Sequence, residues 1–409
     1  MPTSLQMVLK QQAIREVNHP QMFERISGMA FNRGQGFPSV KFSKDVGLVR
    51  TGHILLVHSD ENNRPSLHGW TWFMSYFEVT QTRIDIEATR LRCMNEALPP
   101  NVPFLPDKLI HHEAGALVTG MDGEFLWLDE EMNPVSNQAS PHPMRMNLGV
   151  IVSDQLVATW LDRELMLACM GSMTVNTAVD GHQRAELRTS IGTRTSHYPA
   201  GTTWSHALDA EPMAMASDGE VVVFELYHRG LYGIGLNAHE HWRMPTPEWS
   251  YPKRRPRNKE TIALHVHNGE CWITSRGGRV QRRSLSDGLL IEEHLLEQVE
   301  SPLEHHFKHG EHDLLCSTSG TVTWLSSMRV VKHVQLSGPV QSAVWDEQFN
   351  GWRIAGWREE IFLAEHHHDR RATQELPVHI VPLGCGALVL YNDGSWENSP
   401  FEFAAPNEE

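Results

Sequence analysis

A short apolar segment that ends at a tight turn, followed by a second apolar segment, recurs along this chain of 409 residues and limits its fold more than any other feature. The clearest copy spans residues 116–129, where Asp122 and Gly123 separate two runs of aliphatic and aromatic residues. An Asp-Gly pair accepts the positive φ angles of a hairpin turn, so the unit predicts two antiparallel strands. Because two strands alone cannot bury both faces, we expect further copies to stack on them.

Eight segments of this kind occur along the chain. Their turns are marked by Asp60, Asp122, Asp154, Asp218, Gly277, Ser319, Trp357 and Asp393. The mean spacing of these markers is about 48 residues, and repeats of about 40 to 50 residues are typical of propeller blades. A further strand-like segment precedes most of the hairpins and another often follows, as in residues 261–267 and 331–336. The repeat therefore predicts four antiparallel strands per unit.

Three of the segments after a turn contain Trp followed by Leu, at Trp127, Trp160 and Trp324. A bulky aromatic side chain at the end of an inner strand fills the gap between stacked sheets, so we expect these three rings to pack between units. From about residue 29 onward, the chain resembles the WD40 and quinoprotein-like β-propeller superfamily. The resemblance rests on Trp127-Leu128-Asp129 and Trp160-Leu161-Asp162, which lie where that superfamily places its Trp-Asp dipeptide. The resemblance implies an all-β fold of four-stranded antiparallel blades, seven or eight in number. A pair of β-sandwich domains is the structural alternative.

The order of segments predicts the domain organisation. Residues 1–27 are expected to form a short helical N-terminal extension, and residues 28–409 a single propeller domain with insertions near 171–201 and 244–259. Closure of the ring removes two exposed sheet edges, so we expect residues 28–32 or 39–42 to supply a strand beside residues 387–391.

Composition restricts the partners. The formal net charge of −15 argues against a broad basic surface for a phosphate backbone, so we expect no nucleic acid partner. The five cysteines are far apart and form no C-x-x-C pair, which favours a reducing, cytoplasmic location. No run approaches the roughly 20 apolar residues needed to cross a bilayer, so no membrane association is expected. We expect the protein to be a monomer.

Histidine is abundant, with 25 residues that cluster in several places. On an extended strand, His239 and His241 share one face, as do His265 and His267, and two imidazoles on one face are compatible with a divalent metal. These four residues are the candidate metal ligands. The alternative is that the clusters are solvated surface residues, which the absence of an H-E-x-x-H motif favours. No other cofactor is predicted.

The chain contains no nucleophile elbow, no phosphate-binding loop and no dinucleotide-binding motif, so a binding protein is favoured over an enzyme. The sequence predicts a rigid platform for a protein or peptide, with function located in the loops. Trp249, Arg254 and Arg255, in the proline-rich insertion, are the candidate partner contacts. The alternatives are a metal-dependent hydrolase-type enzyme with a histidine and carboxylate site at the central funnel, and a sensor of a small ligand or metal.

Overall fold

The computed structural model describes residues 98–401 except 113, 190–197, 252–255, 300 and 384–385. These residues belong to the second of the two units into which the chain divides, Thr89–Glu409. The predicted helix in residues 1–27, the predicted domain start at residue 28, the first turn marker and both candidate closing strands lie outside the described residues.

The described residues form seven antiparallel sheets, five with four strands and two with three. Blade 1 contains β1 (Pro106–His112), β2 (Gly115–Gly120) and β3 (Phe125–Leu128), and blade 2 contains β4 (Met146–Val152), β5 (Gln155–Asp162), β6 (Leu167–Thr174) and β7 (Trp204–Leu208). Blade 3 contains β8 (Pro212–Ser217), β9 (Val221–Leu226), β10 (Gly230–Gly235) and β11 (Glu240–Met244), and blade 4 contains β12 (Thr261–His267), β13 (Glu270–Ser275), β14 (Arg279–Ser284) and β15 (Leu290–Leu295). Blade 5 contains β16 (Leu303–His309), β17 (His312–Ser317), β18 (Thr321–Ser326) and β19 (Arg329–Gln335). Blade 6 contains β20 (Ser342–Asp346), β21 (Gly351–Gly356), β22 (Glu359–Ala364) and β23 (His368–Ala372), and blade 7 contains β24 (Pro377–Leu383), β25 (Gly386–Tyr391) and β26 (Trp396–Asn398).

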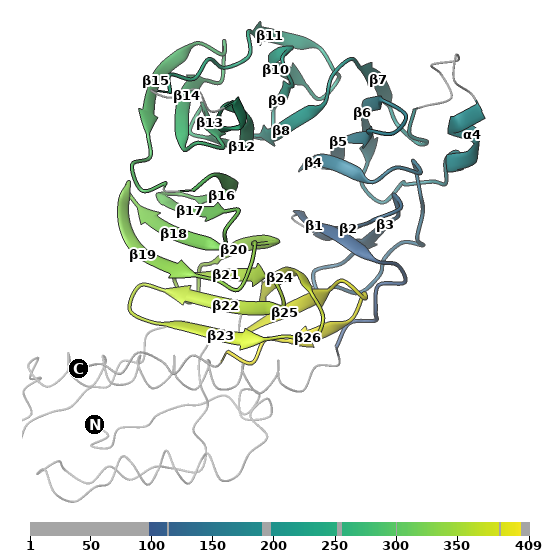
Figure 1. Cartoon of the computed structure of the whole chain (residues 1–409). Coiled ribbons are helices and arrows are strands. Elements are labelled where there is room, and N and C mark those ends of the chain that lie inside the picture. Colours follow the sequence, from purple (N-terminus) through teal and green to yellow (C-terminus); the bar gives the residue numbers. More distant parts are fainter. Residues whose placement is uncertain are drawn as a thin grey trace, which may run out of the picture. The chain divides into compact units, whose positions relative to one another are not determined.

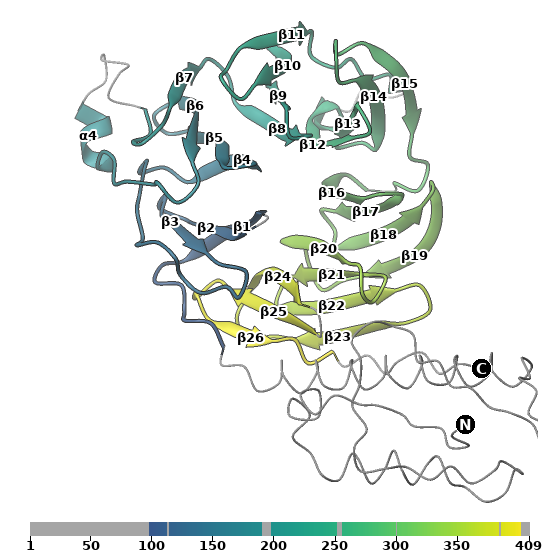
Figure 2. The ribbon, with the colours of Figure 1, turned by 180° about the vertical axis from the view of Figure 1, so that it is seen from behind.

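The seven sheets are arranged in a ring, with the first strand of each blade innermost (Figures 1 and 2). We call the region on the ring axis, between these first strands, the channel. This arrangement is a seven-bladed β-propeller, so the predicted all-β propeller fold is confirmed, with seven blades in the described part of the chain. Blade 1 also has a loose fourth strand, because Ala139 and Pro134 form isolated bridges with Phe125 and Leu128 of β3.

The predicted turn markers are not equivalent positions in the blades. Asp154 and Asp218 lie between the first and second strands of blades 2 and 3, whereas Asp122 and Gly277 lie between second and third strands. The uneven spacing of the markers follows from this difference. In the same way, Trp160 lies in the second strand of its blade and Trp127 in the third strand, so the Trp-Leu pairs do not mark one repeated position.

The expected packing of the tryptophans between blades is nevertheless confirmed. Trp127 of blade 1 and Trp160 of blade 2 are buried in one shared cluster, and Trp324 of blade 5 is buried with Trp352 of blade 6. Apolar area removed from water between neighbouring sheets stabilises each contact between blades by roughly 25 cal/mol per Å². The core is therefore a series of layers between blades.

Packing between blades 7 and 1 closes the ring. Leu109 and Leu128 of blade 1 share a cluster with Leu388 and Trp396 of blade 7. Within blade 7, β25 pairs with β24 on one side and with β26 on the other, so an additional outer strand would lie beyond β26 and not beside residues 387–391.

The innermost strands share a local irregularity. In six of the seven blades, the pairing register of the first strand shifts just after its first residue. A bulge of this kind re-aims the following side chain. Lys108, His305 and His379 occupy the position after the shift in blades 1, 5 and 7, beside the channel.

The two predicted insertions fall in connections that the structure describes in part. Residues 175–203, with the short helix α4 (Arg184–Thr189), connect the third and fourth strands of blade 2. Residues 245–260, with η2 (Pro256–Lys259), connect blade 3 to blade 4. Among the helices in the described part of the chain, none is long and apolar enough to cross a bilayer.

Candidate functional site

Strand direction assigns every turn to one of two faces of the propeller. Because the strands of a blade alternate in direction, turns between first and second strands and between third and fourth strands lie on one face, which we call the first-turn face. Most exposed histidines of the described residues lie at strand ends or connections on this face: His111, His182, His239, His241, His267, His309, His366, His367 and His368. The exposed His206, His228 and His333 lie elsewhere. Histidine is therefore concentrated on one side of the protein.

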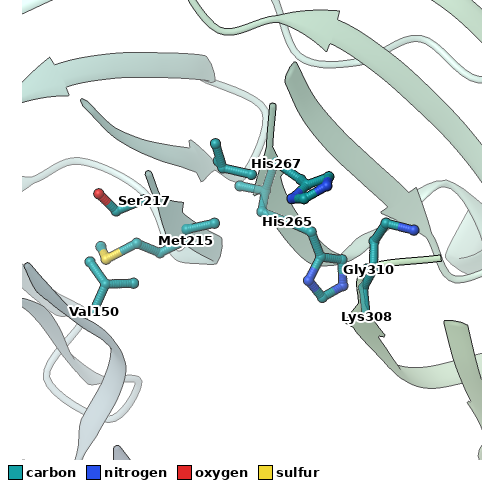
Figure 3. Close-up of a pocket in the computed structure, with 10 residues that line it drawn as sticks. Val150, Met215, Ser217, His265, His267, Lys308 and Gly310 are labelled. Carbon is teal, nitrogen blue, oxygen red and sulfur yellow. The ribbon is translucent and has the colours of Figure 1, made fainter. Parts of the chain in front are cut away.

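A cavity of about 330 Å³ lies at the channel mouth on the first-turn face (Figure 3). It is lined by Val150, Met215, Ala216, Ser217, Leu264, His265, Val266, His267, Lys308 and Gly310. Blades 2 and 3 supply Val150 and Met215 on one side, and blades 4 and 5 supply the imidazoles and Lys308 on the other. No described residue that lines the cavity is an aspartate or a glutamate.

Lys308 is held in place by groups behind the cavity wall. Its Nζ atom donates to Asp313 Oδ1 at 3.0 Å and lies 4.8 Å from the centre of the Trp272 ring. Burial alone raises the pKa of Asp313, but the hydrogen bond and charge of His306, together with Lys308, outweigh burial and lower that pKa. Asp313 is therefore an ionised acceptor that fixes the ammonium group at the cavity.

A hydroxyl, an imidazole and a carboxylate are linked in a chain beside this ion pair. Thr274 Oγ1 lies 2.7 Å from His306 Nδ1, and His306 Nε2 lies 2.8 Å from Asp313 Oδ1. The three residue types are those of a catalytic triad. However, the Thr274 side chain is 0% exposed between blades 4 and 5, where no substrate reaches it. The chain of hydrogen bonds therefore joins two blades.

His265 presents a neutral imidazole to the cavity. Its Nε2 atom donates to the main-chain oxygen of His306 at 2.9 Å, which leaves Nδ1 as the acceptor atom. Burial, reinforced by the nearby His306, lowers the pKa of His265 to about 3. At neutral pH this side chain is therefore a hydrogen-bond acceptor without charge.

The four predicted metal ligands do not come together. His239 and His241 lie at the outermost strand of blade 3, with ring centres 5.6 Å apart, whereas His265 and His267 lie on the innermost strand of blade 4. The described residues contain no group of three or more histidine, cysteine, aspartate or glutamate side chains that could hold a metal. Of the four, His265 and His267 line the cavity.

A histidine pair at the ring closure was not predicted. His111 Nε2 of blade 1 lies 3.1 Å from His379 Nε2 of blade 7. Burial, with the charge of His111 as a smaller cause, lowers the pKa of His379 to about 3. Part of the His111 ring is exposed, but enclosure of the rest by protein also lowers the pKa of His111. The pair is therefore a neutral hydrogen bond across the seam of the ring.

Of the three predicted partner contacts, Trp249 lies within the described residues and two arginines lie outside them. Trp249 is 4% exposed and packs among the buried residues between blades 3 and 4, so little of its ring is accessible to a partner. Arg254 and Arg255 lie outside the described residues.

No family model and no curated protein matches the sequence. Among solved structures, the chain is similar to the computationally designed Ika8 protein, with 9% identity, a TM-score of 0.50, and coverage of 74% of this chain and 99% of that chain. It is also matched to BamB from Moraxella catarrhalis, with 10% identity, a TM-score of 0.43, and coverage of 73% of this chain and 83% of that chain. At these identities the similarity concerns the fold alone.

Proposed function

We propose that this protein is a binding platform that holds a protein or peptide partner on its first-turn face, anchored in the cavity at the channel mouth. The observation that carries the proposal is the cavity itself, in which an apolar wall faces hydrogen-bonding side chains from two other blades. Ligand sites are typically concave, with a few placed polar groups among apolar ones. The ring of packed blades keeps these walls at a fixed separation.

The main chain around the cavity favours a peptide over other ligands. In the described residues, β8 pairs only with β9 and β12 only with β13, so each keeps an unpaired edge toward the channel. An unpaired strand edge offers main-chain donors and acceptors to an extended peptide. The buried Thr274 hydroxyl lends no support to a hydrolase at this place.

The proposal is tested by photo-crosslinking in an extract of the source cells. A photoreactive amino acid replaces Glu311, which is exposed in the turn next to cavity-lining Gly310, or Asp393, which lies in a turn on the opposite face. We expect one protein to be crosslinked from position 311 and absent from position 393. The crosslinking experiment is then repeated in two variants. Ala216→Phe fills the cavity, and Ala207→Phe, on an exposed outer strand, is the matched control.

The proposal is supported if Ala216→Phe loses the crosslink and Ala207→Phe keeps it. An equal yield of the same product from positions 311 and 393, or a yield that Ala216→Phe leaves unchanged, contradicts it. Thermal melting of both phenylalanine variants establishes that each propeller is folded before the comparison is made.

A further inference from the structure

We propose that the cavity binds the free C-terminal carboxylate of a partner chain whose last residue is aliphatic. This inference rests on the proposed function, because it names the part of the partner that enters the anchoring site. It follows from the chemistry of the two cavity walls, from the cavity size and from the charge of the protein.

The polar wall supplies donors for a carboxylate. Lys308 has three ammonium protons, of which one is directed to Asp313, and His267 is exposed at the end of β12. The carboxylate of Asp313 lies behind Lys308 in the second strand of blade 5 and does not line the cavity. Charge-assisted hydrogen bonds of this type are stronger than neutral ones. A carboxylate in the cavity therefore meets the donors of Lys308 and His267 beside one uncharged acceptor, His265 Nδ1, and no like charge among the described lining residues.

The apolar wall distinguishes a chain end from an acidic side chain. Val150 and Met215 lie across the cavity from His265, His267 and Lys308, and Ala216 also lines the cavity. A C-terminal aliphatic residue carries a carboxylate and an apolar side chain on one α-carbon, so it satisfies both walls at once. An internal aspartate or glutamate carries its carboxylate on the side chain and leaves the apolar wall without a partner.

Size and charge lead to the same class of ligand. A volume of about 330 Å³ is at the lower end of the 300 to 1,000 Å³ that is typical of ligand pockets. It admits the end of an extended chain and excludes a folded element. The net charge of −15 repels polyanions at long range, so a single carboxylate is favoured over an acidic run or a polyphosphate. The unpaired edges of β8 and β12 are available to the main chain that precedes the last residue.

The probe is a library of synthetic pentapeptides, randomised at the first four positions, with leucine at the last position as a free acid or as a carboxamide. Peptides retained by the full-length protein are measured singly by fluorescence anisotropy. We expect the acid to bind at least about tenfold more tightly than its own amide, because the amide loses a charge-assisted contact. Replacing the last leucine by glycine is expected to weaken binding by about tenfold or more through lost apolar burial.

Two variants assign the effect to the cavity. Lys308→Gln is expected to remove most of the preference for acid over amide, a readout that a general loss of structure does not produce. His267→Ala, at an exposed position, is expected to weaken binding of the acid more than binding of the amide. His239→Ala is the matched exposed histidine on the same face, and we expect it to change neither affinity.

Acid and amide forms that bind within twofold of each other, or tighter binding of peptides with an internal aspartate and a blocked end, overturn the inference. Retention of no peptide from either library also overturns it. In each of these cases, a crosslink at position 311 that Ala216→Phe abolishes still supports the platform. Loss of that crosslink as well refutes the proposed function itself.

Discussion

Glu225 offers the sharpest prediction about stability. This residue lies in β9 of blade 3, and it is 3% exposed. Burial raises the pKa of Glu225 from 4.5 to about 7, against smaller opposing effects of the Thr261 hydroxyl and the Arg283 guanidinium. The folded protein therefore binds a proton at Glu225 that the unfolded chain releases between pH 4.5 and 7. The stabilising effect of that proton is complete below pH 4.5 and is lost as the pH rises through about 7.

The magnitude follows from the shift of the pKa. One pKa unit corresponds to about 1.4 kcal/mol, so ionisation of buried Glu225 costs about 3 kcal/mol of unfolding free energy above pH 7. Glu225→Gln keeps the shape of the protonated side chain and cannot ionise. We expect this variant to match the wild type near pH 4.5 and to be more stable by about 3 kcal/mol at pH 8.

The assay is denaturant unfolding of both proteins, followed by tryptophan fluorescence at several pH values between 4.5 and 8. Glu220→Gln, at an exposed position in the turn that leads into the same strand, is the matched control and is expected to follow the wild type throughout. Parallel stability curves for the wild type and Glu225→Gln across this range refute the assignment of a raised pKa to Glu225.

Three further predictions concern contacts between blades. Asp313→Asn removes the ionised acceptor of His306 and Lys308, so denaturant unfolding should show an unfolding free energy that is lower by about 3 kcal/mol. A decrease below about 0.5 kcal/mol contradicts the described network. Burial lowers the pKa of His379 to about 3, so between pH 7 and pH 5 the unfolded chain takes up a proton that folded His379 does not, which costs about 2 kcal/mol of unfolding free energy. Because Glu225 stabilises the wild type over the same range, the effect is measured as a difference: His379→Gln should gain about 2 kcal/mol relative to the wild type between pH 7 and pH 5. Equal slopes in the two titrations argue against a buried neutral pair. Trp160→Ala should lower the unfolding free energy by about 3 to 5 kcal/mol because it leaves a cavity between blades. Trp357→Ala, at a ring that is 50% exposed, should have little effect. Similar decreases of the unfolding free energy in both variants contradict packing between blades as the role of Trp160.

The fold was predictable because the hairpin signal is local. An Asp-Gly pair between apolar runs specifies a turn without reference to the rest of the chain, and stacking of such units follows from their exposed faces. Which of the four strands of a blade each turn ends was not predictable in this way. Asp154 and Asp122 both follow an apolar run, but they end different strands of their blades, and the sequence around each turn does not show which strand it ends.

The site was predictable only within single strands. The alternation of a strand places His265 and His267 near each other, and both line the cavity. The chain could not show that His239 and His241 lie in a different blade, at its outer strand. Lys308 was missed because Trp272, whose ring its ammonium group contacts, and His265, which lines the same cavity, come from the adjacent blade. A local signal did exist for its ion pair, since residues 308 and 313 are partners across a short hairpin.

The central claim is that the cavity at the channel mouth anchors a partner on the first-turn face. Its most direct test is the affinity of the crosslinked partner, once purified, for the wild type, Ala216→Phe and Ala207→Phe by isothermal titration calorimetry. We expect Ala207→Phe to bind like the wild type and Ala216→Phe to bind at least about tenfold more weakly, because a filled cavity excludes the anchoring residue. Equal affinity of all three folded proteins contradicts the claim.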